Sequence, residues 1–393
     1  MRAPRSLGFL VFALLGLSGP AWGFPTTAFL TRYWHRPLPL AGKPVPPWPR
    51  FERTLSAQAC ARCHKAQYDA WHASRHALAM GPGVTGQLAV AGPSRWPFVR
   101  SCIFCHAPGD RQWRAVRAFI AHDDHLLTGL AHQGVTCADC HVRHYQRFGP
   151  GLVPYLAAGR VVHNGFTPES AFTRSRFCAG CHQFHKNGTR LHGLLLENTY
   201  NEWRASRYAK TKISCQSCHM PGGHHSFLGI HSRRFVRHAL TIDLRLAPDR
   251  VGHRVHATLA VTNSGVGHDF PTYTTPTVVL SIAQLCGKTI CAGSRRQTVI
   301  ARRISLDLRH QYFDTRLAPG ATRTLHYHLR RRPAATALLA RIVVYPDAAY
   351  VRFFRAYLAA YTLTREEHAQ IERALTRDER SRYILWSQRR PFS

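Results

Sequence analysis

Cys215-Gln-Ser-Cys218-His219 is the last of five copies of one motif in this 393-residue chain. C-x-x-C-H is the covalent attachment site of a c-type haem, in which two thiols hold the macrocycle and the adjacent histidine binds the iron as proximal ligand. Disulfides and zinc sites also use cysteine pairs, but neither needs a histidine directly after each pair. We therefore expect five covalently attached haem c groups. The other four copies are Cys60-Ala-Arg-Cys63-His64, Cys102-Ile-Phe-Cys105-His106, Cys137-Ala-Asp-Cys140-His141 and Cys178-Ala-Gly-Cys181-His182.

The first 23 residues are typical of a secretion signal. Arg2 and Arg5 precede an apolar run from Leu7 to Leu17, and Ala21-Trp22-Gly23 has the small-residue pattern of a cleavage site. A run of this length is too short to span a bilayer, although an uncleaved anchor is the alternative. Because c-type haem is attached outside the cytoplasm, we predict an exported protein in the periplasm or at the cell surface.

The chain carries a formal net charge of +33. In a cytoplasmic protein this charge would indicate nucleic acid. For an exported cytochrome we expect no nucleic acid, but redox partners with acidic docking surfaces, a membrane surface or an outer-membrane complex. The alternative is an arginine-rich composition without a specific partner.

The haem motifs divide the chain into regions. We predict a pentahaem domain over residues 24–236, which leaves roughly 43 residues for each haem, so much of the hydrophobic core must be porphyrin. Short helices and loops are expected there, with a motif opening or closing each helix. Residues 24–55 are rich in proline and aromatic residues, which favours an extended segment instead of a helix.

An internal repeat lies outside the motifs. Tyr68-Asp-Ala-Trp-His-Ala-Ser-Arg-His76-Ala matches Tyr200-Asn-Glu-Trp-Arg-Ala-Ser-Arg-Tyr208-Ala at a spacing that fits a helix. We interpret His76 as a distal ligand of a neighbouring haem, with packing on porphyrin as the alternative. His72 is a weaker candidate, and Tyr208 is expected to pack or to bond a propionate.

The haem region resembles multihaem cytochromes c of the group that includes the tetrahaem electron acceptor of hydroxylamine oxidoreductase. In that group a histidine twelve residues after the first proximal histidine ligates another haem, which implies the same role for His76. The chain departs from the tetrahaem pattern by its fifth motif, so the ligand map does not carry over whole. The matching stretches are residues 60–76, Gly134–His141, Phe177–Phe184, Asn198–Trp203 and Cys215–Pro221.

Distal ligands should be mainly histidine, because only Met80 and Met220 remain after the initiator. The distal candidates are His76, His163, His225, His231 and His268. His268 lies in Asn263-Ser-Gly-Val-Gly-His268-Asp-Phe-Pro271, whose glycines would let the backbone approach the haem domain. This stretch resembles a loop of β-sandwich domains fused to multihaem cytochromes. Weaker candidates are His122, His125, His132, His144, His185 and His192.

Alternating runs from residue 237 predict an immunoglobulin-like antiparallel β-sandwich over residues 237–347. Cys286 and Cys291 are the only pair without a following histidine, and we expect a hairpin disulfide. Residues 348–393 are predicted to be helical, since Thr364-Arg-Glu-Glu367 and Thr376-Arg-Asp-Glu379 both have capping-box patterns. The expected fold class is α+β. The expected strands are residues 240–246, 254–261, 277–282, 304–308 and 341–345.

The most plausible function is electron transfer between redox partners, without catalysis. A reductase or oxidase of a small nitrogen or sulfur compound is the second hypothesis, and it requires one haem with an open distal position. A haem-wire subunit of an extracellular or outer-membrane assembly is the third. No catalytic residue is predicted, and all five motifs end in histidine, so the C-x-x-C-Lys attachment of pentahaem nitrite reductases is absent.

Overall fold

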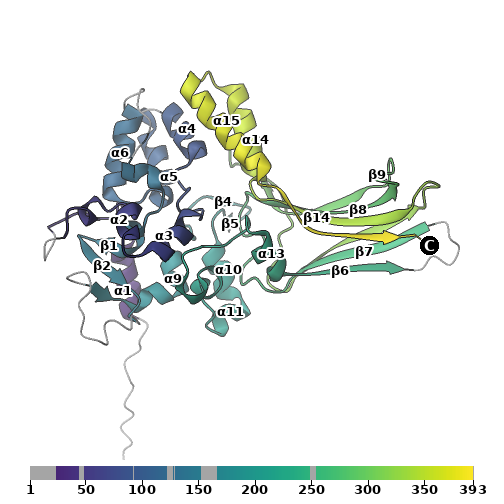
Figure 1. Cartoon of the computed structure of the whole chain (residues 1–393), viewed down its shortest axis with the longest axis horizontal. Coiled ribbons are helices and arrows are strands. Elements are labelled where there is room, and N and C mark those ends of the chain that lie inside the picture. Colours follow the sequence, from purple (N-terminus) through teal and green to yellow (C-terminus); the bar gives the residue numbers. More distant parts are fainter. Residues whose placement is uncertain are drawn as a thin grey trace, which may run out of the picture.

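The computed structural model describes residues 24–43, 48–91, 93–121, 127, 129–151, 166–247 and 254–392. The predicted secretion signal, residues 1–23, lies outside them. Within these ranges we find no helix whose length and hydropathy would allow it to cross a bilayer. A helical region and an elongated β-sandwich lie end to end, with two long helices rising from the sandwich beside the helical region (Figure 1).

The haem region consists of short helices and turns, as predicted. Each C-x-x-C-H motif lies wholly or partly in a short helix. Hydroxyl side chains cap the helices of the third and fifth motifs, where Thr136 and Ser214 each form a capping box. The motif helices are α2 (Ala57–Ala61), α5 (Trp96–His106), α7 (Cys137–His141), α9 (Ser175–Cys178) and α12 (Cys215–His219). The other helices here are α3 (Lys65–His72), α4 (Pro82–Ala91), α6 (Asp110–Ala121), α10 (Thr199–Ala205), α11 (Arg207–Lys210) and α13 (Arg233–Ala239).

The prediction of an extended segment over residues 24–55 is wrong at its start, where α1 (Phe24–Tyr33) is a helix. The reason is packing: Leu30 and Tyr33 are buried against Ala171 and Phe177. The Tyr33 hydroxyl also donates to the carbonyl of Cys140, at 2.7 Å, which ties α1 to the third motif. Residues 37–43 form no helix, as the prolines indicate, and Leu38 makes a parallel bridge with Gly109, but Glu52–Thr54 form a short 3-10 helix.

The β-sandwich confirms the α+β fold class. One sheet has the strand order β10-β8-β14-β15, and the other has the order β13-β7-β6; all pairs are antiparallel. Along β7 every second residue is buried, which is the alternation that the sequence showed. The bounds are β6 (Leu240–Ala247), β7 (Arg254–Asn263), β8 (Thr277–Cys286), β10 (Arg296–Ile300), β13 (Thr322–Arg330), β14 (Ala337–Tyr345) and β15 (Tyr383–Pro391).

One predicted strand, residues 304–308, is misplaced. The strand is β11 (Arg302–Ile304), paired with β12 (Gln311–Asp314), and the chain then turns. The Ser305 hydroxyl accepts from the backbone N–H groups of Arg309 and His310, which stabilises the turn over the extended form. A disulfide joins Cys286 and Cys291 in the hairpin between β8 and β9 (Thr289–Ile290).

The end of the chain corrects the helical prediction for residues 348–393. Helices α14 (Ala348–Ala360) and α15 (Arg365–Arg380) form, and Thr364 makes the expected capping box with Glu367. Thr376 does not start a second helix because it lies inside α15. After α15 the chain returns as β15, which covers the free edge of β14.

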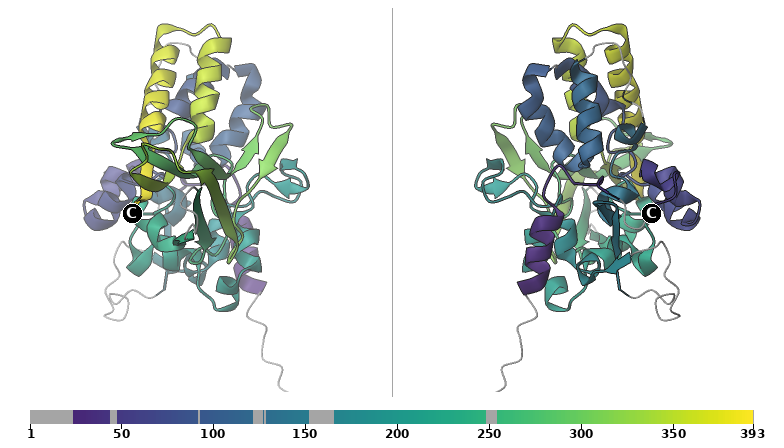
Figure 2. Two further views of the ribbon diagram at one scale, coloured as in Figure 1. Left: turned by 90° about the vertical axis from the view of Figure 1, so that its right-hand side faces the viewer. Right: turned by 90° about the vertical axis from the view of Figure 1, so that its left-hand side faces the viewer.

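The C-terminal helices pack against α4 of the haem region. The view in Figure 2 places α14 and α15 beside the α4–α6 helices. Ile371 and Phe354 pack so closely on α4 that a side chain at Gly86 or Gly83 would collide with them.

The predicted boundary at residue 236 falls inside α13, which leads directly into β6.

Candidate haem centre

A single cavity of about 2610 Å³ lies within the haem region and at its border with the sandwich. A pocket for one drug-sized ligand holds about 300–1,000 Å³, so this cavity has room for several macrocycles. None of the ten motif cysteines forms a disulfide, so all ten are available for covalent attachment. All five motifs line the cavity with both cysteines and the histidine: Cys60, Cys63 and His64; Cys102, Cys105 and His106; Cys137, Cys140 and His141; Cys178, Cys181 and His182; Cys215, Cys218 and His219.

Three proximal histidines are oriented by backbone carbonyls. The Nδ1 atom of His106 lies 2.6 Å from the carbonyl oxygen of Ala79, and that of His141 lies 2.8 Å from Phe148. His219 Nδ1 lies 2.5 Å from the carbonyl of Leu228. Metal-binding histidines commonly donate their second N–H in this way, which fixes the ring and leaves the other nitrogen for the metal. The geometry therefore presents Nε2 of each ring to an iron.

His182 has a different partner. Its Nδ1 lies 2.6 Å from the hydroxyl oxygen of Tyr273, which belongs to the loop between β7 and β8. A loop of the sandwich thus contacts the proximal histidine of the fourth motif. Nothing in the local sequence linked Tyr273 to His182, because the two lie 91 positions apart.

Three histidine pairs have the separation of axial ligands. Two imidazoles that share one metal ion each bind it at about 2 Å, and each ring centre lies roughly 1 Å further back, so the centres lie about 6 Å apart. The ring centres of His76 and His182 are 6.1 Å apart, and those of His141 and His225 are also 6.1 Å apart. His219 and His268 are 6.2 Å apart. The residues therefore fit iron between two rings at three of the five motifs.

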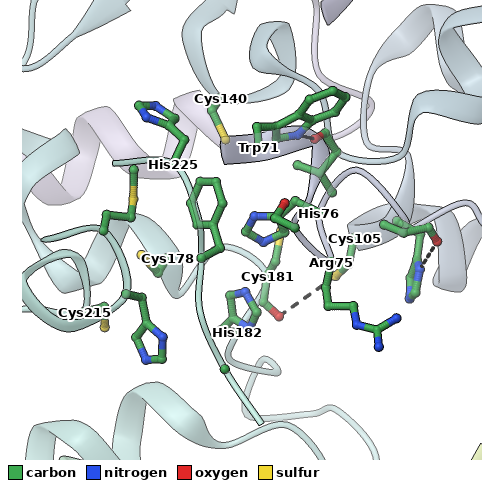
Figure 3. Close-up of a pocket in the computed structure, with 18 of the residues that line it drawn as sticks. Trp71, Arg75, His76, Cys105, Cys140, Cys178, Cys181, His182, Cys215 and His225 are labelled. Carbon is green, nitrogen blue, oxygen red and sulfur yellow. Dashed lines mark hydrogen bonds between the residues drawn. The ribbon is translucent and has the colours of Figure 1, made fainter. Parts of the chain in front are cut away.

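His76 projects toward His182 from the turn after α3 (Figure 3). Its carbonyl accepts from the N–H of Val135, and a side chain at Gly134, whose φ is +67°, would lie 2.4 Å from that carbonyl. Only glycine allows this approach. Burial, together with His182 and His219, lowers the pKa of His76 to about 3, so the ring is neutral, as a metal ligand must be.

His268 reaches the cavity from the sandwich. Its Nδ1 lies 2.8 Å from the carbonyl of Asp269, and its own carbonyl accepts from the Asn263 side chain. A side chain at Gly267 would lie 3.2 Å from the Trp203 ring, so the loop lies against the haem region, as its glycines indicate. Burial lowers the pKa of His268 to about 4. His225 is held through Nδ1 by the carbonyl of Gly223.

The remaining candidates are placed differently. His231 lines the cavity, but its Nε2 lies 2.9 Å from an Asp347 oxygen, so that nitrogen is engaged in an ion pair. His163, His122 and His125 lie outside the described residues. The Tyr208 hydroxyl donates to the carbonyl of Ser264, which follows β7. His72, His132, His144, His185 and His192 are exposed.

The comparisons with known proteins agree with this geometry. A family model described as "Cytochrome c554 and c-prime" matches residues 59–142. The crystal structure of a penta-heme cytochrome c552 from Thermochromatium tepidum is similar with a TM-score of 0.59 and 18% identity, covering 86% of this chain and 98% of that one. No curated protein matches. The structural likeness shows the fold, and both findings together support a multihaem cytochrome c with covalently bound haem c.

Proposed function

We propose that this protein is an exported pentahaem c-type cytochrome that carries electrons between redox partners. The observation that carries the proposal is the convergence of all five motifs on one cavity, with three histidine pairs spaced for axial ligation. Haem c supplies reversible one-electron chemistry, and two histidine ligands favour lower potentials than a Met/His pair. The fold shared with a penta-heme cytochrome supports a count of five haems.

The chain's own residues hold and orient the groups. Ten cysteines provide the covalent links, and the proximal rings are His64, His106, His141, His182 and His219. We assign His76 as the distal ligand opposite His182, His225 opposite His141, and His268 opposite His219. His231 keeps its ion pair with Asp347 in this assignment, and His163 stays a candidate for one of the other two haems.

The net charge of +33 supports partners with acidic docking surfaces, or a membrane surface or outer-membrane complex that carries negative charge. Electrostatic steering of this kind raises the association rate and weakens with ionic strength. We expect electron exchange with an acidic redox protein to slow markedly between low and physiological salt, as stopped-flow measurements would record. A rate independent of salt would remove the electrostatic part of the proposal.

A second function rests on His106. In the part of the chain that the structure describes, no histidine ring lies at the axial spacing from His106. An open haem at this position would make the protein a reductase or oxidase of a small nitrogen or sulfur compound. Mass spectrometry should first establish five haems on the mature chain; addition of nitrite, hydroxylamine or sulfite would then shift the spectrum of one haem only if it is open.

A further inference from the structure

The Tyr273 hydroxyl, which contacts Nδ1 of His182, lies beside a chain of hydrogen-bonded polar side chains. Thr199 lies close to the Tyr273 hydroxyl, and the Thr199 hydroxyl oxygen lies 2.8 Å from Oε1 of Glu197. The same oxygen lies 2.7 Å from the Thr272 hydroxyl, which is 2.7 Å from Oε2 of Glu202. Three hydrogen bonds thus join two carboxyl groups through the hydroxyls of Thr199 and Thr272, beside the Tyr273 hydroxyl that His182 contacts.

Counting protons along this chain assigns one to Glu197. Each hydrogen bond needs one proton, and a hydroxyl group supplies one. The contacts of Thr199 with Glu197, of Thr199 with Thr272 and of Thr272 with Glu202 need three protons, but the two hydroxyl groups supply only two. The third must come from a carboxyl group.

Glu202 is the poorer candidate for that proton. Its Oε1 lies 3.0 Å from the Arg316 guanidinium, and both side chains are almost completely buried. Burial and nearby Asp269 raise the pKa of Glu202, whereas the hydrogen bond with Thr272 and the charge of Arg316 lower it, so the ion pair opposes protonation of this carboxyl. Among the residues that the structure describes, no cation forms an ion pair with Glu197. As a neutral acid, Glu197 would donate to Thr199, which then donates to Thr272, so that every contact has its proton.

The surroundings of Glu197 agree with this count. Burial raises its pKa to about 8; its hydrogen bonds with Thr199 lower the pKa, and nearby Glu202 raises it. Cys181 and Cys105 also face this carboxyl, but they lose their ionisable thiols on haem attachment. Glu197, Thr199, Tyr273 and His182 all line the cavity, so bound haem covers them further.

We propose that Glu197 is a proton-binding site coupled to the haem that His182 holds. The inference rests on the proposed function, because it requires haem at the fourth motif. Glu197 takes one proton from solvent when that haem accepts one electron from a redox partner, and it returns the proton on oxidation. The physical cause is charge: an oxidised haem carries one more positive charge, which favours the carboxylate, and reduction removes it.

The test uses the full-length, haem-loaded protein and its Glu197→Gln variant. In the wild type we expect the potential of one haem to fall as pH rises, by up to a tenfold change in the equilibrium constant per pH unit, which is about 59 mV for one electron. The variant should lose this slope for that haem. Glutamine still bonds Thr199, and Glu366→Gln, exposed on α15, is the matched control.

Redox-difference infrared spectroscopy gives an independent readout. The wild type should show the carbonyl band of a protonated carboxylic acid that changes with redox state, and Glu197→Gln should lack it. Tyr273→Phe keeps Glu197 but cuts its link to His182, so we expect the band's redox response to weaken even if Glu197→Gln fails to fold. An unchanged slope and band in the variants, with the full haem count and reducible haems, would overturn the inference; a missing haem would instead count against the proposed function.

Discussion

The sandwich and the haem region bury their apolar side chains in different ways. The sandwich has one continuous core of 19 buried residues drawn from both sheets. The haem region has smaller clusters set around the cavity, the largest with 9 buried residues among those described. Apolar side chains such as Leu78 and Phe104 line the cavity and remain exposed in the polypeptide alone. The comparison indicates that the sandwich folds on its own residues, whereas the haem region requires its cofactors.

The largest expected effect is therefore the loss of haem. When the chain is produced without haem attachment, we expect the haem region to stay unfolded while the sandwich forms. Limited proteolysis should then digest residues 48–235 and leave a resistant fragment that contains β6 to β15. Equal resistance of both regions would show that the haem region folds without its cofactors.

The second prediction concerns the sandwich core. Leu280→Ala removes a fully buried side chain on β8 and should cost about 2–5 kcal/mol of unfolding free energy, as denaturant titration would measure. The haem spectrum should not change, since Leu280 does not line the cavity. Leu246→Ala, on an exposed side chain of β6, is the control and should cost far less.

The third prediction concerns a single iron. His76→Ala should convert one haem from low-spin to high-spin with the haem count unchanged, because His182 loses the ring opposite it. Electron paramagnetic resonance detects the change. His72 lies one turn earlier and is exposed, so His72→Ala should not change the spin state of any haem. A spin change in both variants would indicate general disruption of the haem region.

The smallest effect concerns the contact between the two regions. Burial acts to raise the pKa of Asp347, but the hydrogen bond from His231 and the charge of Arg75 outweigh it, so the pKa lies below its ordinary value. A lowered pKa stabilises the fold above pH 3.8, and this contribution is lost as pH falls through the folded value.

The matched variant is Asp347→Asn. It should cost about 1–2 kcal/mol at neutral pH and flatten the acid limb of the stability curve. Asp243→Asn, on a carboxylate that is 45% exposed, is the control. If both variants unfold at the same acid midpoint as the wild type, the ion pair between His231 and Asp347 contributes nothing to holding the regions together.

Local patterns predicted much of the site. The C-x-x-C-H spacing predicted the attachment residues, which all line one cavity. The repeat drew attention to His76, and the glycines beside His268 indicated a close approach. These signals are local, and the structure brings them together. Tyr273 and Glu197 were missed because their roles depend on a contact between distant segments. The Nε2 of His231 faces Asp347, which no pattern near either residue indicates.

The fold shows the same division. Alternation placed most of the sandwich strands, and the capping box placed the start of α15. The helix α1 was missed because its proline-rich neighbours outweighed the spacing of Leu30 and Tyr33. The strand β15 was missed because only the free edge of β14, more than 35 residues earlier, makes Tyr383–Pro391 extended.

The central claim is that one cavity holds five haems, at least three of them between paired histidines. The most direct measurement is the ferric electron paramagnetic resonance spectrum of the purified protein, recorded with a haem count by mass spectrometry. We expect five haems and at least three low-spin signals. Replacing His76, His225 or His268 by alanine should each remove one low-spin signal. Five attached haems with mainly high-spin signals would contradict the ligand pairing.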